Sequence, residues 1–330
     1  MRTRFHIGLA MALVAGGAVG LIPAASAQYD RAPRVDVHAE RSFDRDPQAI
    51  TLPRGIVEAA SAYETYLRGA TTIRAAFRDS AAVKQAMNVG EAYQPAQMEE
   101  GMIAYAALIA LEDERFVSGV QMSTQGREDN ARAADDLLAN PASVAAIPGA
   151  GGAAALVRAV LREEGGRLFE TGRAVKQSAY AIQHQAWSKQ TVPDPADRLA
   201  RAKSLARIAF VPAPEDVTRL LRAAEGFRGR RASEDQGLSA RSPVIERGLT
   251  LAALAVLGQA KDERRLERLL SEPRGADCMK MSKLNLYQCL AVAGPHYEDV
   301  FCLGQHALMD TGQCVAGGGG EGSLERVASR

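Results

Sequence analysis

Residues 278–314, CMKMSKLNLYQCLAVAGPHYEDVFCLGQHALMDTGQC, contain all four cysteines of the 330-residue chain. Zinc ribbons and thiol redox sites use closely spaced cysteine pairs, and neither C-x-x-C nor the haem-binding C-x-x-C-H occurs in this stretch. An even number of cysteines in an exported protein indicates disulfide bonds. We therefore predict that two disulfides staple this stretch, and that its thiols bind neither a metal nor a cofactor.

The first arm of the stretch, residues 277–292, has the leucine-rich character of a helix. Four cysteines allow three pairings. On a continuous helix Cys278 and Cys289 are separated by about 16 Å of rise, whereas the Cα atoms of a disulfide lie within about 7 Å of each other. The helix therefore excludes that pair. The competing arrangement, Cys278 with Cys289 and Cys302 with Cys314, would need both arms to be loops.

The second arm returns towards the start of the first. Gly294-Pro295 predicts a turn, and residues 296–310 predict a returning helix that Thr311-Gly312 ends. In an antiparallel hairpin the two cysteines nearest the turn face each other, and so do the two at the open end. The expected bridges are nested: Cys289–Cys302 and Cys278–Cys314.

The start of the chain has the pattern of a secretory signal peptide. Arg2 and Arg4 give a positive start, residues 7–22 form an apolar core, and Ala25-Ser26-Ala27 supplies a cleavage site before Gln28. We expect cleavage to leave a periplasmic or secreted protein of the bacterial envelope, without a transmembrane segment. Its expected partner is another envelope protein.

The composition is that of a globular protein with little net charge. The chain has 40 basic and 39 acidic residues, which argues against nucleic acid as a partner because such proteins carry excess positive charge. From residue 54 onward alanine, leucine, arginine and glutamate dominate, and β-branched runs of period two are missing. We therefore predict an all-α fold, a multi-helical bundle or an array of helical hairpins, with a disulfide-stapled C-terminal helical hairpin.

Prolines and glycines divide the chain into segments of helical length. The predicted organisation is a signal peptide (1–27), an extended or disordered arm (28–53), an N-terminal helical block (54–225), an exposed loop (226–242), a C-terminal helical block with the cysteines (243–314) and a flexible glycine-rich tail (315–330).

Two segments repeat small residues every seven positions. A seven-residue repeat keeps one seam facing a partner helix. Glycine costs about 1 kcal/mol of helix propensity relative to alanine, so close packing should compensate. We predict that segment 55–78 packs against segment 153–189 through this seam; chance in an alanine-rich chain is the alternative. The small residues are Gly55, Ala62, Gly69 and Ala76 in the first segment, and Gly165, Gly172, Ala179 and Ala186 in the second.

Four residues are candidates for a catalytic site. Asp113 falls on the apolar stripe of segment 95–120, and His296, Asp299 and His306 lie within eleven residues of the returning arm. On a helix, Asp299 and His306 would share a face, and a histidine–carboxylate cluster can bind a divalent metal or transfer a proton. The structural alternative is that Asp113 pairs with an arginine, that Asp299 favours the positive helix start, and that the histidines pack or face solvent.

The sequence contains no HExxH, GxSxG or SxxK motif and no glycine-rich phosphate loop. We therefore expect an exported helical protein of the bacterial envelope that serves as a non-catalytic interaction or scaffolding module. The alternative is a periplasmic hydrolase of helical fold whose carboxylates and histidines meet only in three dimensions. A deep pocket lined by Asp113 or His306 would favour the hydrolase, and a long exposed groove would favour the binding module.

Overall fold

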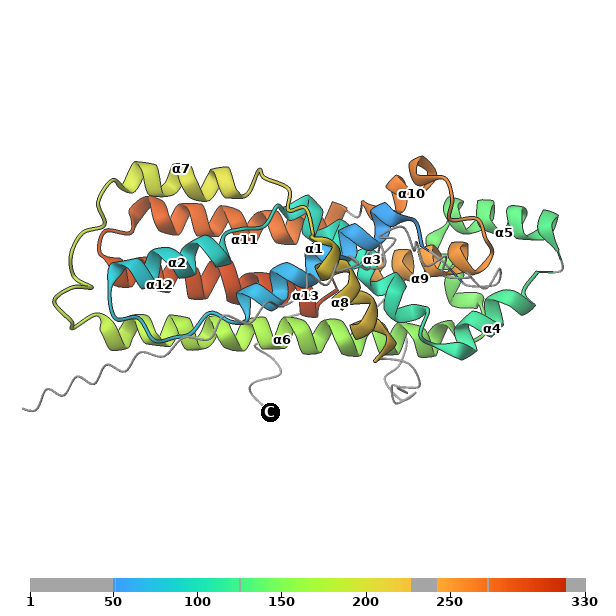
Figure 1. The fold of residues 1–330 in the computed structure, drawn as a ribbon, viewed down its shortest axis with the longest axis horizontal. Coiled ribbons are helices and arrows are strands. Elements are labelled where there is room, and N and C mark those ends of the chain that lie inside the picture. Colours follow the sequence, from blue (N-terminus) through green and yellow to red (C-terminus); the bar gives the residue numbers. More distant parts are fainter. Residues whose placement is uncertain (1–49, 51, 125, 227–241, 272, 319–330) are drawn as a thin grey trace, which may run out of the picture. The chain divides into compact units, whose positions relative to one another are not determined.

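The computed structural model describes residue 50 and residues 52–124, 126–226, 242–271 and 273–318 (Figure 1). The regular elements of these ranges are helices, and none of them is both long enough and apolar enough to cross a bilayer. The all-α fold is thus confirmed. The elements are α1 (Arg54–Ala70), α2 (Ser80–Gly90), α3 (Pro95–Ala110), α4 (Glu114–Met122), α5 (Arg127–Ala139), η1 (Pro141–Ala146), α6 (Ala150–Ile182), α7 (Pro195–Leu205), α8 (Pro214–Glu225), α9 (Pro243–Val256), α10 (Glu263–Leu270), α11 (Pro273–Val292), α12 (His296–Cys302), η2 (Leu303–Asp310) and α13 (Thr311–Ala316).

The predicted signal peptide lies outside the described residues, as do most of the arm (28–49 and 51), the loop 227–241 and the tail from 319. The two ends of the predicted loop are described. Gly226 is exposed, whereas Ser242 is buried and caps α9 through its side chain.

Prolines stand at the start of many helices. The first backbone N–H groups of a helix have no partner inside it, so a proline there loses no hydrogen bond, and its fixed φ already suits the helix. The residues that divide the sequence into segments therefore also begin the next helix. Six helical elements begin in this way, at Pro95, Pro141, Pro195, Pro214, Pro243 and Pro273.

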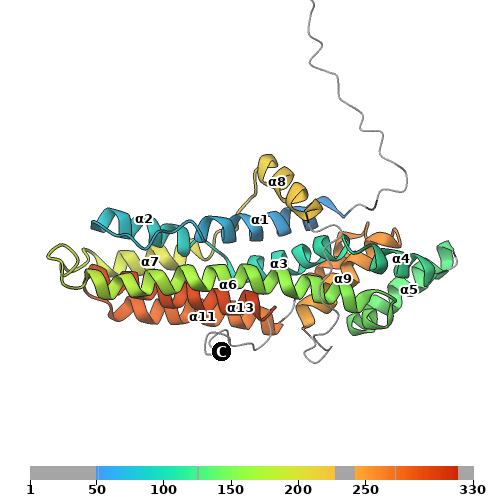
Figure 2. The same ribbon diagram turned by 90° about the horizontal axis from the view of Figure 1, so that it is seen from below.

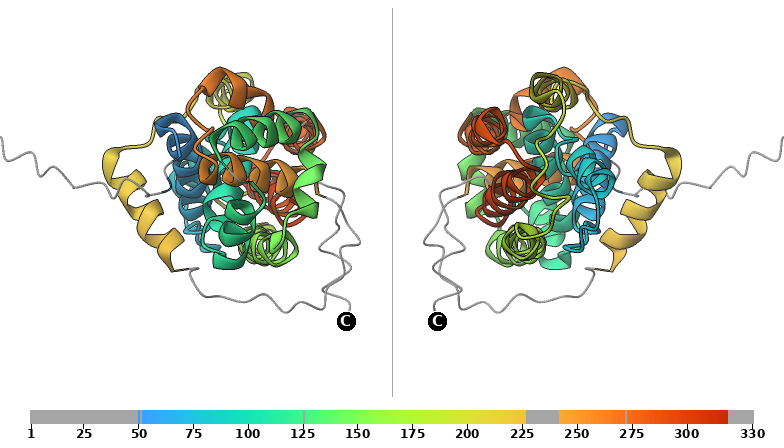
Figure 3. Two further views of the ribbon diagram at one scale, coloured as in Figure 1. Left: turned by 90° about the vertical axis from the view of Figure 1, so that its right-hand side faces the viewer. Right: turned by 90° about the vertical axis from the view of Figure 1, so that its left-hand side faces the viewer.

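Helix α3 joins the two predicted helical blocks into one core. Its residues 101–110 are all buried, and it contacts α1 of the N-terminal block as well as α9 and α11 of the C-terminal block. The views along the long axis in Figure 3 show helices on several sides of α3, with α8 against the outer side of α1. The two blocks are thus parts of a single hydrophobic core.

The small-residue seam of α6, at Gly165 and Gly172, packs against the C-terminal arm formed by α12, η2 and α13 (Figure 2). The prediction that this seam faces segment 55–78 was wrong, although α6 does contact α1 through Glu164 and Tyr63. A Cβ at Gly172 would lie 2.7 Å from the Gly304 carbonyl oxygen, and one at Gly312 would lie 2.7 Å from the Gly165 carbonyl oxygen. Real Cβ atoms do not approach backbone this closely, so only glycine allows the two helices their present distance. The small residues of α6 thus mark a close helix contact, as predicted, but the partner is the C-terminal arm.

The first segment makes its close approach through another glycine. Helix α1 ends at Ala70 and packs mainly against α3, where a Cβ at Gly101 would lie 2.5 Å from the Ala59 carbonyl oxygen and 2.6 Å from Tyr63 Cβ. Gly55, by contrast, is exposed. Ala62 is buried, but a Cβ at Gly69 would meet nothing within 4 Å and Ala76 is exposed, so the seven-residue spacing in this segment does not mark one contact face.

The C-terminal arm contains eight residues of π-helix, η2, between α12 and α13. Gly165 and Gly172 are seven residues apart in α6, whereas their partners Gly304 and Gly312 are eight apart. A π-helix closes its hydrogen bonds over five residues instead of four, so it holds more residues in each turn than an α-helix does. The π segment thereby lets an eight-residue spacing match the seven-residue spacing of a straight α-helix.

Two disulfides staple the arm to α11. Cys289 is bonded to Cys302 near the turn and Cys278 to Cys314 at the open end, with Cα separations of 5.7 and 5.8 Å. This is the nested pairing that the helix-rise argument predicts.

The arm does not end at Thr311-Gly312, as the sequence had indicated. Gly312 lies against α6, so this glycine permits contact and does not stop the helix. Helix α13 continues to Ala316, and Val315 is fully buried. The first residues of the predicted flexible tail thus belong to the core, and the Ser242 hydroxyl fixes the next turn by donating to the Gly318 carbonyl at 2.8 Å.

Candidate functional site

A buried arginine from α7 holds the turn of the C-terminal hairpin. Arg198 forms an ion pair with Asp299 of α12, and it donates to the carbonyls of Leu290 and Ala293, the latter at 3.0 Å. The last carbonyls of a helix have no partner inside it. Arg198 therefore satisfies the end of α11 and neutralises a carboxylate of α12 at the same time.

Both members of this ion pair are only 3% exposed. Burial raises the pKa of Asp299 to about 7, against the opposing effect of the Arg198 charge. A raised carboxyl pKa often marks a functional residue. Here every described contact of Asp299 serves the hairpin turn, so the structural role accounts for its burial.

His296 begins α12 beside the same ion pair. Its ring centroid lies 6.4 Å from that of Trp187, and its backbone N–H donates to the Gln190 carbonyl at 3.3 Å. Burial, followed by the positive charge of Arg198, lowers the pKa of His296. This shift favours the neutral imidazole, which packs beside the hairpin turn.

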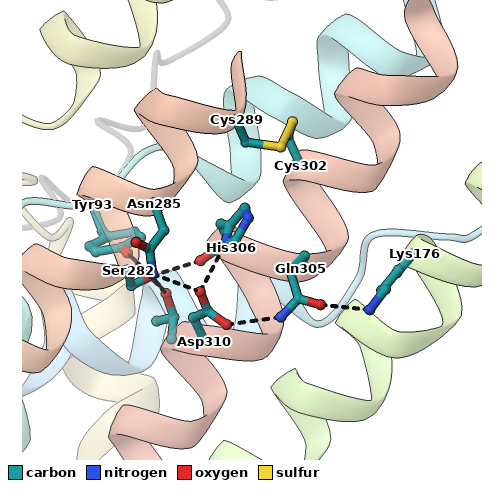
Figure 4. Close-up of polar contacts among 10 residues, drawn as sticks. Tyr93, Lys176, Ser282, Asn285, Cys289, Cys302, Gln305, His306 and Asp310 are labelled. Carbon is teal, nitrogen blue, oxygen red and sulfur yellow. Dashed lines mark hydrogen bonds and ion pairs between the residues drawn. A yellow bond between two sulfur atoms is a disulfide. The ribbon is translucent and has the colours of Figure 1, made fainter. Parts of the chain in front are cut away.

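His306 lies in the π segment and pairs with an acid of the same arm (Figure 4). Its Nδ1 is 2.8 Å from Asp310 Oδ2. Gln305 Nε2 donates to the other carboxylate oxygen at 3.0 Å, and Gln305 Oε1 accepts from Lys176 Nζ at 2.7 Å. A line of polar contacts thus joins α6 to the stapled arm.

Asp299 and His306 do not form a common site, although seven residues separate them. The helix changes from α to π after Cys302, and the wider π turns place later side chains at other angles than a continuous α-helix would. Asp299 contacts Arg198, and His306 contacts Asp310. The shared face expected from the spacing is therefore not formed.

Three buried hydroxyl groups, those of Tyr93, Ser282 and Thr311, lie within hydrogen-bond distance of one another beside the π segment (Figure 4 labels the first two). Tyr93 Oη lies 3.0 Å from Ser282 Oγ and 2.9 Å from Thr311 Oγ1, and the last two are 2.8 Å apart. Ser282 Oγ also donates to the His306 carbonyl at 2.7 Å. The serine thus contacts the backbone of the histidine and is not placed against its ring, as a nucleophile activated by that ring would be.

Asp113 caps a helix. Its Oδ1 accepts hydrogen bonds from the backbone N–H groups of Arg115 and Phe116, both at 3.0 Å, at the start of α4. An aspartate in this position satisfies groups that the first turn leaves unpaired. The apolar stripe predicted for segment 95–120 lies on two helices, because α3 ends at Ala110 and α4 begins at Glu114. Asp113 and His306 therefore belong to separate local structures.

A buried acid–base pair that was not predicted, Glu91 and Lys283, lies between the C-terminal end of α2 and α11. Glu91 is 1% exposed and Lys283 is 3% exposed. The Lys283 ammonium donates to the backbone carbonyl of Glu91 and lies 3.7 Å from the centroid of the Tyr93 ring. Burial raises the pKa of Glu91 to about 7 and lowers the pKa of Lys283 to about 7.

A second buried acid lies in the long helix α6. Glu164 accepts hydrogen bonds from the hydroxyls of Tyr63 at 3.1 Å and Tyr105 at 2.8 Å, which come from α1 and α3. Burial raises the pKa of Glu164 to about 7. This contact ties three helices together at one point of the core.

The sequence did contain a signal for two of these residues. Glu164 lies three residues after Leu161 and four before Leu168, and Lys283 lies four after Met279 and three before Leu286, so each stands on an apolar stripe. A charged residue in such a place must have a partner or a shifted pKa. Glu91 follows the end of α2, and no periodic pattern marks it.

The buried Arg198, Lys283 and Glu164 hold helices together through ion pairs and hydrogen bonds. The His306–Asp310 pair is the histidine–carboxylate contact of the C-terminal arm. Among the described residues, no group of three or more histidines, cysteines, aspartates or glutamates is arranged to hold a metal ion. Comparisons of the chain with protein-family models, with curated proteins and with solved structures found no match.

Proposed function

We propose that this chain is an exported, disulfide-stapled helical protein of the bacterial periplasm that serves as a non-catalytic interaction module. The disulfides and the lack of a membrane-crossing helix among the described residues are compatible with that location. The predicted signal peptide supports it independently.

One surface segment carries the proposal of binding. Residues 208–211, between α7 and α8, present three large apolar side chains to solvent: Ile208 is 61% exposed, Phe210 40% and Val211 83%. Single exposed apolar residues are common, but three within four positions of an irregular segment indicate a contact surface. Its proposed occupant is an apolar face of another envelope protein.

The same segment is held in position before any partner arrives. Gln97 of α3 donates to the Phe210 carbonyl at 2.7 Å and accepts from the Phe210 N–H at 2.9 Å. A segment whose backbone is already fixed loses less conformational entropy on binding. Anchored backbone and exposed apolar side chains together favour a binding role for residues 208–211.

Position-specific crosslinking in cells tests this proposal. A photo-crosslinking residue placed at Ile208 or Val211 should give one adduct of the same mass from the periplasm. Met122 of α4, which is 73% exposed, is the matched control and should not give it. Gln97→Ala should lower the adduct yield because it frees the Phe210 backbone. Equal adducts from all three positions, or none from residues 208–211, would contradict the proposal.

A periplasmic hydrolase is the second candidate, and the His306–Asp310 pair is the observation that favours it. His306→Ala should then abolish the ability of the gene to restore a deletion strain, while the adduct from Val211 and the melting temperature stay unchanged. If the variant restores the strain as well as the wild type does, His306 has no catalytic role.

A further inference from the structure

We propose that a basic pocket between α7 and α11 binds a small organic phosphate. The pocket has a volume of about 420 Å³, within the range of ligand-binding cavities. Its walls come from the end of α7, one face of α11 and the first residue of α3. The lining residues are Pro95, Lys203, Ala206, Arg207, Lys280, Lys283, Leu284 and Tyr287.

The charge of the lining identifies the sign of the ligand. Four of these eight residues are basic and none is acidic. Lys203, Arg207 and Lys280 are exposed, and Asp277 approaches Lys280 to 3.3 Å as a solvent-exposed ion pair. Like charges around a concave surface repel one another and raise the local concentration of anions. Several cations also favour a ligand with more than one negative charge.

Lys283 is a buried basic residue of the pocket lining. Its ammonium is held by the Glu91 carbonyl and the Tyr93 ring, and burial lowers its pKa to about 7. Removing an ammonium group from water is costly unless other groups replace the lost solvation. The Glu91 carboxyl opposes this lowering of the pKa, and an anion in the pocket would do so as well, so the lining combines one buried cation with the three exposed ones.

The remaining lining residues indicate that the ligand has an organic part. Leu284 and Tyr287 lie one turn apart on α11, and Pro95 and Ala206 complete an apolar wall. Lysine acts as a point charge for phosphate, arginine adds directed donors, and a phosphate group carries close to two negative charges at neutral pH. A phosphate ester with an apolar or aromatic group fits both halves of this lining.

Calorimetric titration of the purified protein with phenyl phosphate tests the site, with inorganic phosphate, citrate and chloride compared at equal ionic strength. We expect phenyl phosphate to bind more tightly than inorganic phosphate, and both to bind more tightly than chloride. Lys203→Gln with Arg207→Gln should weaken phenyl phosphate binding at least about tenfold, whereas Lys84→Gln with Arg222→Gln should change it by less than about twofold. All four side chains are exposed, so the variants keep the fold.

The apolar wall has its own matched pair. Leu284→Ser should remove the preference for phenyl phosphate over inorganic phosphate, whereas Met281→Ser, at a 52% exposed position on the same helix that does not line the pocket, should keep it. Absence of binding, equal losses in the two double variants, or tighter binding of citrate than of phenyl phosphate would overturn the proposal. The crosslinking test of residues 208–211 does not depend on this result.

Discussion

Replacing Gly172 with alanine tests the packing of α6 against the C-terminal arm, and Gly166 is the matched control. Both glycines lie in the middle of α6. A Cβ at Gly172 would meet the Gly304 carbonyl and the Met309 N–H nitrogen at 2.7 Å, whereas a Cβ at Gly166 would meet nothing within 4 Å. The same substitution on the same helix should therefore have opposite effects.

The magnitudes follow from two contributions. Alanine gains about 1 kcal/mol of helix propensity over glycine at either position. At Gly172 the new methyl group overpacks against backbone atoms, which costs about 1–3 kcal/mol. Gly166→Ala should thus stabilise the protein by up to about 1 kcal/mol, and Gly172→Ala should destabilise it by up to about 2 kcal/mol.

The gain in helix propensity is the same in both variants, so the difference between their free energies of unfolding reports only the contact of residue 172 with the C-terminal arm. This difference should amount to about 1–3 kcal/mol, or about 2–6 °C in melting temperature for a protein of this size. Urea and thermal unfolding followed by far-UV circular dichroism measure it. Equal stabilisation by Gly172→Ala and Gly166→Ala would refute the close approach between α6 and the arm.

Two further predictions concern buried charges. Burial raises the pKa of Glu164 to about 7, so between pH 4.5 and 7 the folded state holds a proton that the unfolded state has released. The free energy of unfolding should therefore fall as pH rises through this range, by at most about 1.4 kcal/mol per pH unit from this group. Glu164→Gln should make that slope shallower, and Glu163→Gln at the exposed neighbouring position should leave it unchanged, when unfolding by urea is measured from pH 4.5 to 7. Arg198→Ala should cost about 3–5 kcal/mol, since it leaves a buried carboxylate and two helix-end carbonyls without their donor. Asp299→Asn, which keeps a side-chain oxygen for the arginine, should cost less in the same assay, and an equal or greater loss would place the main contribution of Arg198 elsewhere.

The helices and the staple could be predicted from the sequence because both depend on local geometry. Pro243 and Pro273 mark helix starts through their own backbone, and the rise of one helix excludes a bond between Cys278 and Cys289. Both features depend on residues that are close together in the sequence.

The partner of the seam could not be predicted in this way. Gly165 and Gly172 indicate a close approach, but they do not say to which helix. Their partners are eight residues apart, and a π-helix, which the sequence did not predict, brings that spacing into register with seven. The same π segment separates Asp299 from His306, so one unpredicted feature altered both the packing and the candidate site.

The buried ionisable groups were missed for a related reason. Glu164 and Lys283 stand on apolar stripes, yet a stripe does not reveal whether tyrosines or a backbone carbonyl will meet the charge. Arg198 lies on a short polar helix, and its partners come from residues about 90–100 positions further along the chain. Contacts of this kind depend on tertiary packing alone.

Mass spectrometry of the protein recovered from the periplasm, before and after digestion without reduction by trypsin together with a protease that cleaves before aspartate, tests the account most directly. If the protein is exported and both disulfides form, the mature chain should begin at Gln28, and its mass should be lower by four hydrogens than that of the reduced chain. We also expect linked peptides that join Cys278 to Cys314 and Cys289 to Cys302, because cleavage after Lys283 and before Asp299 and Asp310 leaves each cysteine on its own peptide. A retained Met1, four free thiols, or a peptide joining Cys278 to Cys289 would contradict the account.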